Sequence, residues 1–186
     1  ISGVGRSINY YPIGDEKADE GVVELALGLG KYIVDGGLCL RVCPHHPDKV
    51  LQTSEMEIAL RETQTSFFAL DTSPVDGAGQ QGLQFQVDDA FNLKRVTVRD
   101  ADKDGSLRWI VSTYDPYDQC IYDGYYEGKN RKIVSFSGVL QNDVFPLPEL
   151  LRKVLDYGQK EMGRPVEIEF AVNLHDNKQG EFYLLQ

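Results

Sequence analysis

The residues best suited to chemistry lie near the end of the chain, where two carboxylates and an amide follow a strand-like pattern. Glu167 and Glu169 alternate with apolar residues over 166–172, and this period of two predicts a β-strand with both carboxylates on one face. A polar loop follows, and a second alternating segment ends at Gln186. In suitable register these neighbouring strands bring Glu169 and Gln186 together. Carboxylate and amide oxygens are ligands that Mg²⁺ takes beside phosphate oxygens.

A second candidate lies near the start of the chain, in the run VELALGLGK over 23–31. Glu24 is the only acidic residue of an apolar segment that predicts a buried strand, and Gly28 and Gly30 then form a glycine-rich turn. A Gly-x-Gly pair is a weak signal for a phosphate-binding loop. On the residues alone, packing explains this segment better than nucleotide binding does.

Helical periodicity marks the element that positions the Glu169 strand. Apolar residues recur at helical spacing over 147–162, Pro148 suits the first turn and Gly163 suits the C-terminal cap, so we predict a helix there. The other expected elements are strands within 1–12, 22–29 and 30–37, a helix over 53–60 capped by Thr53 or Ser54, a loop over 70–81 and a mostly strand-forming region over 83–140.

Composition limits the classes of function. A chain of 186 residues with 41% hydrophobic and 10% aromatic content is typical of one globular domain. A formal charge of −10 argues against a general nucleic-acid-binding surface, although a bound cation offsets such a field at a nucleotide site. No apolar run approaches the ~18 residues of a membrane span, so we expect no membrane partner. Three cysteines without regular spacing favour a reducing cytoplasm over a disulfide framework.

Two other segments contain metal-ligand residue types. The first holds Cys39, Cys43, His45 and His46. We do not expect zinc there, because no second pair of ligands follows at the spacing of zinc sites. The second, DADKDGSLRWIV over 100–111, begins like a calcium loop but places Val111 where calcium needs a bidentate glutamate. An Asp/Gly β-turn is the better prediction for it.

The two ends of the chain together resemble the ATP-grasp domain of phosphoenolpyruvate synthase and pyruvate phosphate dikinase. A helix ending in Gly, then Pro-hydrophobic-acid-Ile-Glu-aromatic, then a hairpin closing on Leu-Gln is similar to the end of that domain. Glu24 followed by Gly-Leu-Gly at 28–30 matches its glycine segment. The resemblance implies that Glu169 and Gln186 hold Mg²⁺ and ATP as metal ligands and nucleotide contacts, with Glu24 near the nucleotide.

The resemblance also implies a fold. We expect an α+β, ATP-grasp-like nucleotide-binding domain fragment over 1–186, with a family-like core at 1–52 and 146–186 and a β-rich insertion at 53–145. Lys31 departs from the glutamate of the family, and Glu167 is a weaker candidate for an outer partner of the metal site. In the family the closing strand continues to an arginine that contacts the transferred phosphate. Because this chain ends before it, we expect a fragment that is inactive alone.

For the parent protein, the resemblance implies a dikinase that converts ATP, pyruvate and water into phosphoenolpyruvate, AMP and phosphate. The phosphoryl group passes through a histidine on another domain, and pyruvate binds to a third. Two alternatives stay open: a relative with another acceptor, such as an α-glucan or an antibiotic, and a non-catalytic, degenerate nucleotide-binding module. The acceptor domain distinguishes them, and it is not in this chain.

Overall fold

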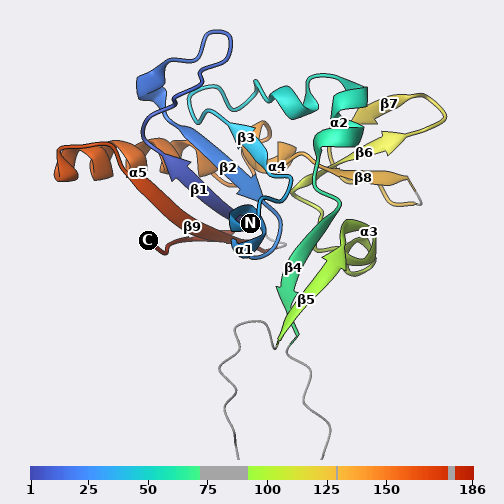
Figure 1. Ribbon diagram of the computed structural model, residues 1–186. Coiled ribbons are helices and arrows are strands. Elements are labelled where there is room, and N and C mark those ends of the chain that lie inside the picture. Colours follow the sequence, from blue (N-terminus) through green and yellow to red (C-terminus); the bar gives the residue numbers. More distant parts are fainter. Residues whose placement is uncertain (72–91, 129, 176–178) are drawn as a thin grey trace, which may run out of the picture.

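The computed structural model describes residues 1–71, 92–128, 130–175 and 179–186. Its centre is an antiparallel five-stranded sheet in the order β10-β9-β1-β2-β3 (Figure 1). The strands are β1 (Ser2–Arg6), β2 (Val22–Ala26), β3 (Leu40–Val42), β9 (Glu167–Leu174) and β10 (Gly180–Leu184). Because β9 pairs with β1, the first and last segments of the described chain form one sheet.

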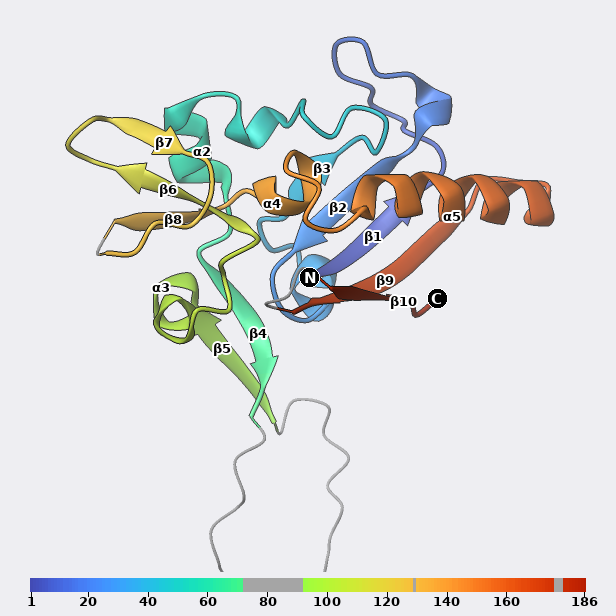
Figure 2. The same cartoon turned by 180° about the vertical axis from the view of Figure 1, so that it is seen from behind.

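Helix α5 (Leu147–Met162) covers one face of this sheet (Figure 2). The bounds confirm the predicted helix, and Gly163 ends it in the left-handed conformation at φ 62°. Leu147, Leu151 and Leu155 of the helix are buried. A Cβ atom at Gly5 would lie 3.1 Å from Ile168 and 3.5 Å from Leu155, so the helix, β1 and β9 are in close contact. We call this the covered face.

The opposite face of the same sheet carries charged side chains. In the antiparallel register Val4 pairs with both Glu24 and Glu169, and Arg6 pairs with Glu167. Residues directly opposite each other in such a sheet point to the same side. We call this side the charged face, and its charged members on β1, β2, β3 and β9 are Arg6, Glu24, Arg41, Glu167 and Glu169.

The middle of the described chain forms two smaller antiparallel sheets. One pairs β4 (Ser66–Leu70) with β5 (Leu93–Thr97), and the other has the order β7 (Cys120–Tyr122), β6 (Val111–Asp115), β8 (Arg131–Val134). The prediction of a strand-rich region is thus confirmed in part. Two segments expected as strand are helical, α3 (Val98–Ala101) and α4 (Ser137–Leu140). The Thr97 side chain accepts a hydrogen bond from the Asp100 amide and so starts α3 as an N-cap.

The prediction of a strand over 30–37 was wrong. Residues Lys31–Val34 form the short helix α1, with Gly30 before it in the right-handed helical region at φ −57°. The amide of Val34 donates to the carbonyl of Gly30, and Gly36 turns the chain at φ 75°. The glycines on both sides permit this compact turn, which the apolar run Tyr-Ile-Val concealed.

Two smaller predictions also need correction. The expected helix over 53–60 is α2 (Met56–Glu62), preceded by the 3₁₀ turn η2 (Leu51–Thr53). Thr53 and Ser54 do not cap it, because their hydroxyls donate to the carbonyls of Val50 and Leu51. In place of the Asp/Gly β-turn, α3 continues into the 3₁₀ turn η3 (Asp102–Asp104). Most of the loop predicted over 70–81 lies outside the described residues.

Candidate functional site

The two predicted carboxylates from opposite ends of the chain lie on the same face of the sheet. Glu24 and Glu169 are the register partners of Val4 on its two neighbouring strands. Because adjacent strands are about 4.8 Å apart, their backbones lie roughly 10 Å from each other. Two glutamate side chains facing one side across this distance can address a single metal–phosphate group. The sequence-based expectation that Glu167 and Glu169 share a face is confirmed as well.

The end of the chain brings Gln186 opposite Glu169 through a β-bulge. The amides of Leu185 and Gln186 both donate to the carbonyl of Glu169, at 2.8 and 3.3 Å. The amide of Glu169 donates in return to the carbonyl of Gln186 at 3.0 Å. Two residues on one strand thus oppose one residue on the other, which is the definition of a bulge. The backbone contact between the two predicted metal ligands follows from this bulge.

The glycine segment lies against the same part of the sheet. Gly28 has φ 88°, and a Cβ atom there would lie 2.5 Å from the carbonyl oxygen of Phe68, so only glycine fits without displacement. This oxygen accepts a hydrogen bond from the Leu29 amide at 3.0 Å. A cavity of about 130 Å³ is lined by Ser2, Gly3, Val4, Gly28, Leu29, Gly30, Val34, Glu169, Phe170, Ala171 and Leu185. It brings the Gly-Leu-Gly motif and Glu169 into one space.

Arg6 is a member of this face that sequence reasoning missed. Its Nε atom lies 2.5 Å from Oε2 of Glu167, and Nη1 lies 3.9 Å from Oε2 of Glu24. The guanidinium therefore stands between two carboxylates and offsets part of their charge. Strand alternation from Ser2 through Val4 predicts the face of Arg6, but its partners required the register. Glu167, the expected outer partner, is the closer of the two.

A partly buried ion pair lies at the β3 end of the charged face. Arg41 faces Glu24 in the register, yet its guanidinium binds Glu16 at 2.8 Å and the side-chain oxygen of Asn9 at 3.1 Å. Burial of Glu16 opposes its ionisation, but hydrogen bonds from Arg41, Ile13 and Asn9 outweigh burial and hold the pKa of Glu16 below its usual value. The Arg41 side chain thus interacts with the β1–β2 loop.

Lys31, where the chain departs from the resembled family, forms a local ion pair. The ammonium of Lys31 lies 3.0 Å from Oδ1 of Asp35, one helical turn later. Both side chains are about half exposed, so this pair contributes little to stability. Glu169, in contrast, makes no ion pair with any residue that the structure describes. Its carboxylate therefore remains available to a cation.

The family model of the pyruvate phosphate dikinase AMP/ATP-binding domain matches residues 1–186. The chain belongs to this family. It is therefore an AMP/ATP-binding domain of the dikinase type, and the resemblance drawn from its two ends is confirmed. No curated protein and no solved structure matches the chain.

Within this dikinase family member, the other candidate sites are less organised. Asp100, the first residue of the calcium-like loop, pairs with Lys103 at 2.7 Å and with Thr97 at 2.8 Å. No helix in the described part of the chain is long and apolar enough to cross a membrane.

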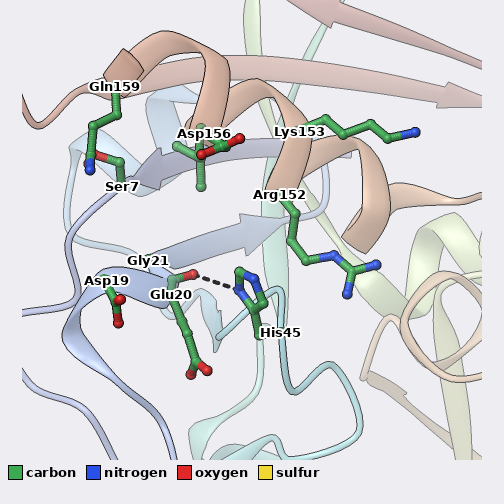
Figure 3. A pocket seen from close by; sticks show the side chains of 10 residues that line it. Ser7, Asp19, Glu20, Gly21, His45, Arg152, Lys153, Asp156 and Gln159 are labelled. Carbon is green, nitrogen blue, oxygen red and sulfur yellow. Dashed lines mark hydrogen bonds between the residues drawn. The ribbon is translucent and has the colours of Figure 1, made fainter. Parts of the chain in front are cut away.

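A larger cavity lies between α5 and the loop before β2, and it contains none of the predicted residues. Its volume is about 280 Å³, and its lining combines Arg152, Lys153 and Asp156 of α5 with Asp19 and His45 of the facing loops (Figure 3). Lys153 is already paired with Glu149 at 2.6 Å. Acidic and basic groups of similar number line this space, so its charge favours neither an anion nor a cation.

Proposed function

We propose that the charged face binds Mg²⁺–ATP, with Glu169 and Gln186 as metal ligands and Glu24 beside the nucleotide phosphates. The observation that supports this most strongly is the register: Glu24 and Glu169 flank Val4 on one face, although 145 residue positions separate them in the sequence (169 − 24). The bulge adds Gln186 to the same point. All three groups offer oxygen, as Mg²⁺ requires.

The charge of the face fits a metal–nucleotide complex better than a free nucleotide. Glu24, Glu167 and Glu169 outnumber Arg6, so bare phosphates would be repelled. A divalent cation between carboxylates and phosphates removes this repulsion. The glycine loop, whose backbone approaches Phe68 closely, leaves room beside Glu169 for a phosphate. These features support the proposal that the charged face binds the nucleotide together with the cation.

For the parent protein, we propose a phosphoenolpyruvate synthase-like dikinase. Its reaction would convert ATP, pyruvate and water into phosphoenolpyruvate, AMP and phosphate by way of a phosphohistidine on another domain. The contribution of this chain would be to position the phosphates and offset their charge, which is most of what phosphoryl transfer needs. Mg²⁺ would supply the Lewis acid. The unpaired thiols of Cys39, Cys43 and Cys120 suit a reducing cytoplasm.

The ligand assignment is tested by Glu169→Gln in the intact protein. We expect the dissociation constant for Mg²⁺–ATP, measured by isothermal titration calorimetry, to rise about 10- to 100-fold, because a charged ligand is lost. Glu181→Gln is the matched control, since Glu181 pairs with Asn173 and shares the face of Glu169 at the far end of β10. Unchanged affinity in Glu169→Gln would refute the assignment.

The reaction is tested by phosphorus NMR of the intact protein with Mg²⁺–ATP, with and without pyruvate. Pyruvate-dependent formation of phosphoenolpyruvate, AMP and phosphate is the expected result. AMP and phosphate without pyruvate dependence would instead indicate another acceptor for the same nucleotide site. The absence of any turnover would indicate a binding module, the alternative that the lysine at position 31 favours.

A further inference from the structure

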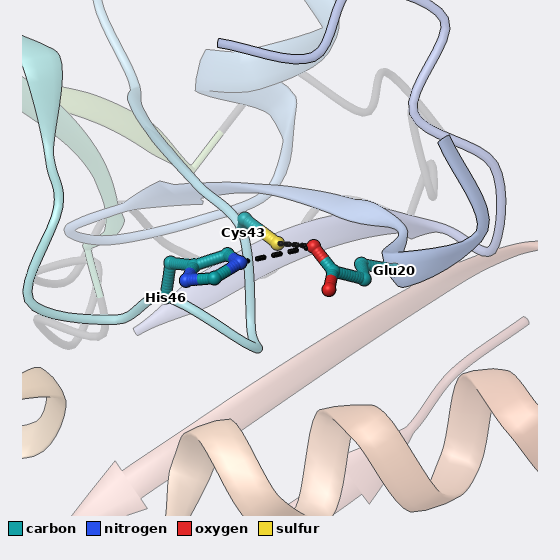
Figure 4. Close-up of side chains that lie close together, drawn as sticks. All are labelled: Glu20, Cys43 and His46. Carbon is teal, nitrogen blue, oxygen red and sulfur yellow. Dashed lines mark hydrogen bonds and ion pairs between the residues drawn. The ribbon is translucent and has the colours of Figure 1, made fainter. Parts of the chain in front are cut away.

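Three metal-ligand side chains meet away from the charged face. Glu20 ends the 3₁₀ turn η1 (Ala18–Glu20), Cys43 follows β3 directly, and His46 lies three residues further on (Figure 4). Oε2 of Glu20 lies 3.0 Å from Nε2 of His46 and 4.0 Å from Sγ of Cys43. All three ligand atoms lie within 4.8 Å of one another.

These separations are close to those of a zinc site. Zinc–sulfur bonds of about 2.3 Å and zinc–nitrogen or zinc–oxygen bonds of about 2.1 Å place tetrahedral ligand atoms roughly 3.4–3.6 Å apart. The observed 3.0 and 4.0 Å lie on either side of this range. The distances of Glu20 to its two neighbours therefore differ from those of a tetrahedral site by about half an ångström, and no pair of the three ligand atoms is more than 4.8 Å apart.

The backbone holds the two ligands from the β3 side before any ion binds. The amide of His46 donates to the carbonyl of Cys43 at 2.9 Å, which closes a four-residue turn. Pro44 occupies the second position of this turn, where its fixed φ is favourable. The Cys-x-x-His spacing is thus set by a preformed turn, and the Cys43 side chain is fully buried.

The third ligand is held from the other side. Oε2 of Glu20 accepts a hydrogen bond from the Lys17 amide at 2.9 Å. Nδ1 of His45 lies 3.0 Å from the carbonyl oxygen of Glu20, which fixes the backbone of this residue. In Figure 3 the Glu20 carboxylate points away from the cavity beside α5, while its carbonyl faces His45. The carboxylate is therefore directed toward Cys43 and His46.

We propose that Glu20, Cys43 and His46 bind one Zn²⁺ ion, with water as the fourth ligand. Thiolate, imidazole and carboxylate together are a zinc donor set, whereas Mg²⁺ takes oxygen ligands. On binding, the Cys43 thiol loses its proton to solvent, and the bond between His46 and Glu20 is replaced by two bonds to the metal. The ion links the β1–β2 loop to the turn after β3, and the site is independent of nucleotide binding.

The sequence concealed this site because one ligand comes from a distant loop. The segment 39–46 offers two cysteines and two histidines, but only Cys43 and His46 take part. Cys39 lies near Glu24, and His45 bonds to backbone. Glu20 is separated from Cys43 by the whole of β2 and β3, so no local spacing pattern contains it.

The test is metal binding by the intact protein after removal of metal with a chelator. Titration with Co²⁺ should give the visible ligand-field bands of a tetrahedral site and a thiolate-to-metal charge-transfer band. His46→Gln should lose this site, or weaken it at least about 100-fold, since loss of a direct ligand exceeds the 10- to 100-fold effect of outer-shell changes. His45→Gln and Cys39→Ser, the neighbouring histidine and cysteine, are matched controls that should retain it.

A second measurement guards against variants that fail to fold. Zn²⁺ should raise the melting temperature of the wild-type protein and of His45→Gln, but not that of Glu20→Gln, whose carboxylate becomes an amide of equal size. Identical Co²⁺ spectra and stoichiometry in the wild type and His46→Gln would overturn the proposal. A wild-type protein that binds neither ion would overturn it too, and would leave Glu20, Cys43 and His46 as a hydrogen-bonded cluster.

Discussion

The same strands form both faces of the five-stranded sheet, but one face carries packed apolar side chains and the other carries charged ones. Phe170 and Glu169 are adjacent in β9, yet Phe170 is 1% exposed and stacks on Phe182 at 5.3 Å, whereas Glu169 is half-buried and faces Glu24 across Val4. The covered face is specified by shape, since its side chains fill a closed space against α5. The charged face carries the carboxylates that we propose as the Mg²⁺–ATP site. Stability and binding are therefore separable in this domain, position by position.

The largest expected effect is on the covered face. Phe170→Ala should lower the free energy of unfolding by about 3–5 kcal/mol, because it removes a buried ring and leaves a cavity beside Phe182. Its neighbour gives the contrast: Glu169→Gln should change stability by less than about 0.5 kcal/mol while weakening Mg²⁺–ATP binding. Urea unfolding of the intact protein measures the change in stability of both variants. If Glu169→Gln lost as much free energy of unfolding as Phe170→Ala, the two faces would not differ in their contribution to stability.

A smaller effect on stability is expected at Gly3, where the covered face leaves no room for a side chain. A Cβ atom at Gly3 would lie 2.2 Å from Cζ of Phe170, so Gly3→Ala should cost about 1–3 kcal/mol through overpacking. Combining it with Phe170→Leu should cost less than the sum of the two single changes, because the shorter side chain relieves the overlap. The control is Gly30→Ala, where the new atom meets only Ser2 at 3.9 Å. The stability of Gly30→Ala should stay within about 1 kcal/mol of the wild type. If Gly30→Ala lost as much stability as Gly3→Ala, the overlap with Phe170 would not be the cause of the loss.

Sequence patterns predicted the elements that carry one clear periodicity. Helix α5 was predicted with its bounds, because the apolar spacing, Pro148 and Gly163 all agree. The alternation over 166–172 likewise placed Glu167 and Glu169 on one face. At Lys31–Val34 the pattern failed, since a four-residue helix between glycines offers less than two turns of periodicity. Short elements are decided by tertiary contacts that no local window contains.

For a related reason, only part of the candidate site could be predicted from the sequence. Each predicted residue was visible in its own segment, but their joint position depends on the pairing of β1 with both β2 and β9. Arg6 was missed because a single cation at a strand end carries no motif. The bulge at Leu185 and Gln186 could not be predicted either, since an alternating pattern assumes a regular ladder. Residue types thus indicated the chemistry, and the register supplied the geometry.

The smallest expected effect reports on the charge of the charged face itself. Burial, as the largest cause, and the negative charge of Glu24 together raise the pKa of the Cys39 thiol to about 11, although the positive charge of Arg6 opposes this rise. Glu24→Gln removes a negative charge that disfavours the thiolate, so it should lower the pKa of Cys39. At a fixed mildly alkaline pH, alkylation of Cys39 by iodoacetamide, followed by mass spectrometry, should then accelerate by a factor on the order of 3. Glu181→Gln should leave the rate unchanged. Equal rates in the wild type and Glu24→Gln would mean that the field of Glu24 does not extend to Cys39.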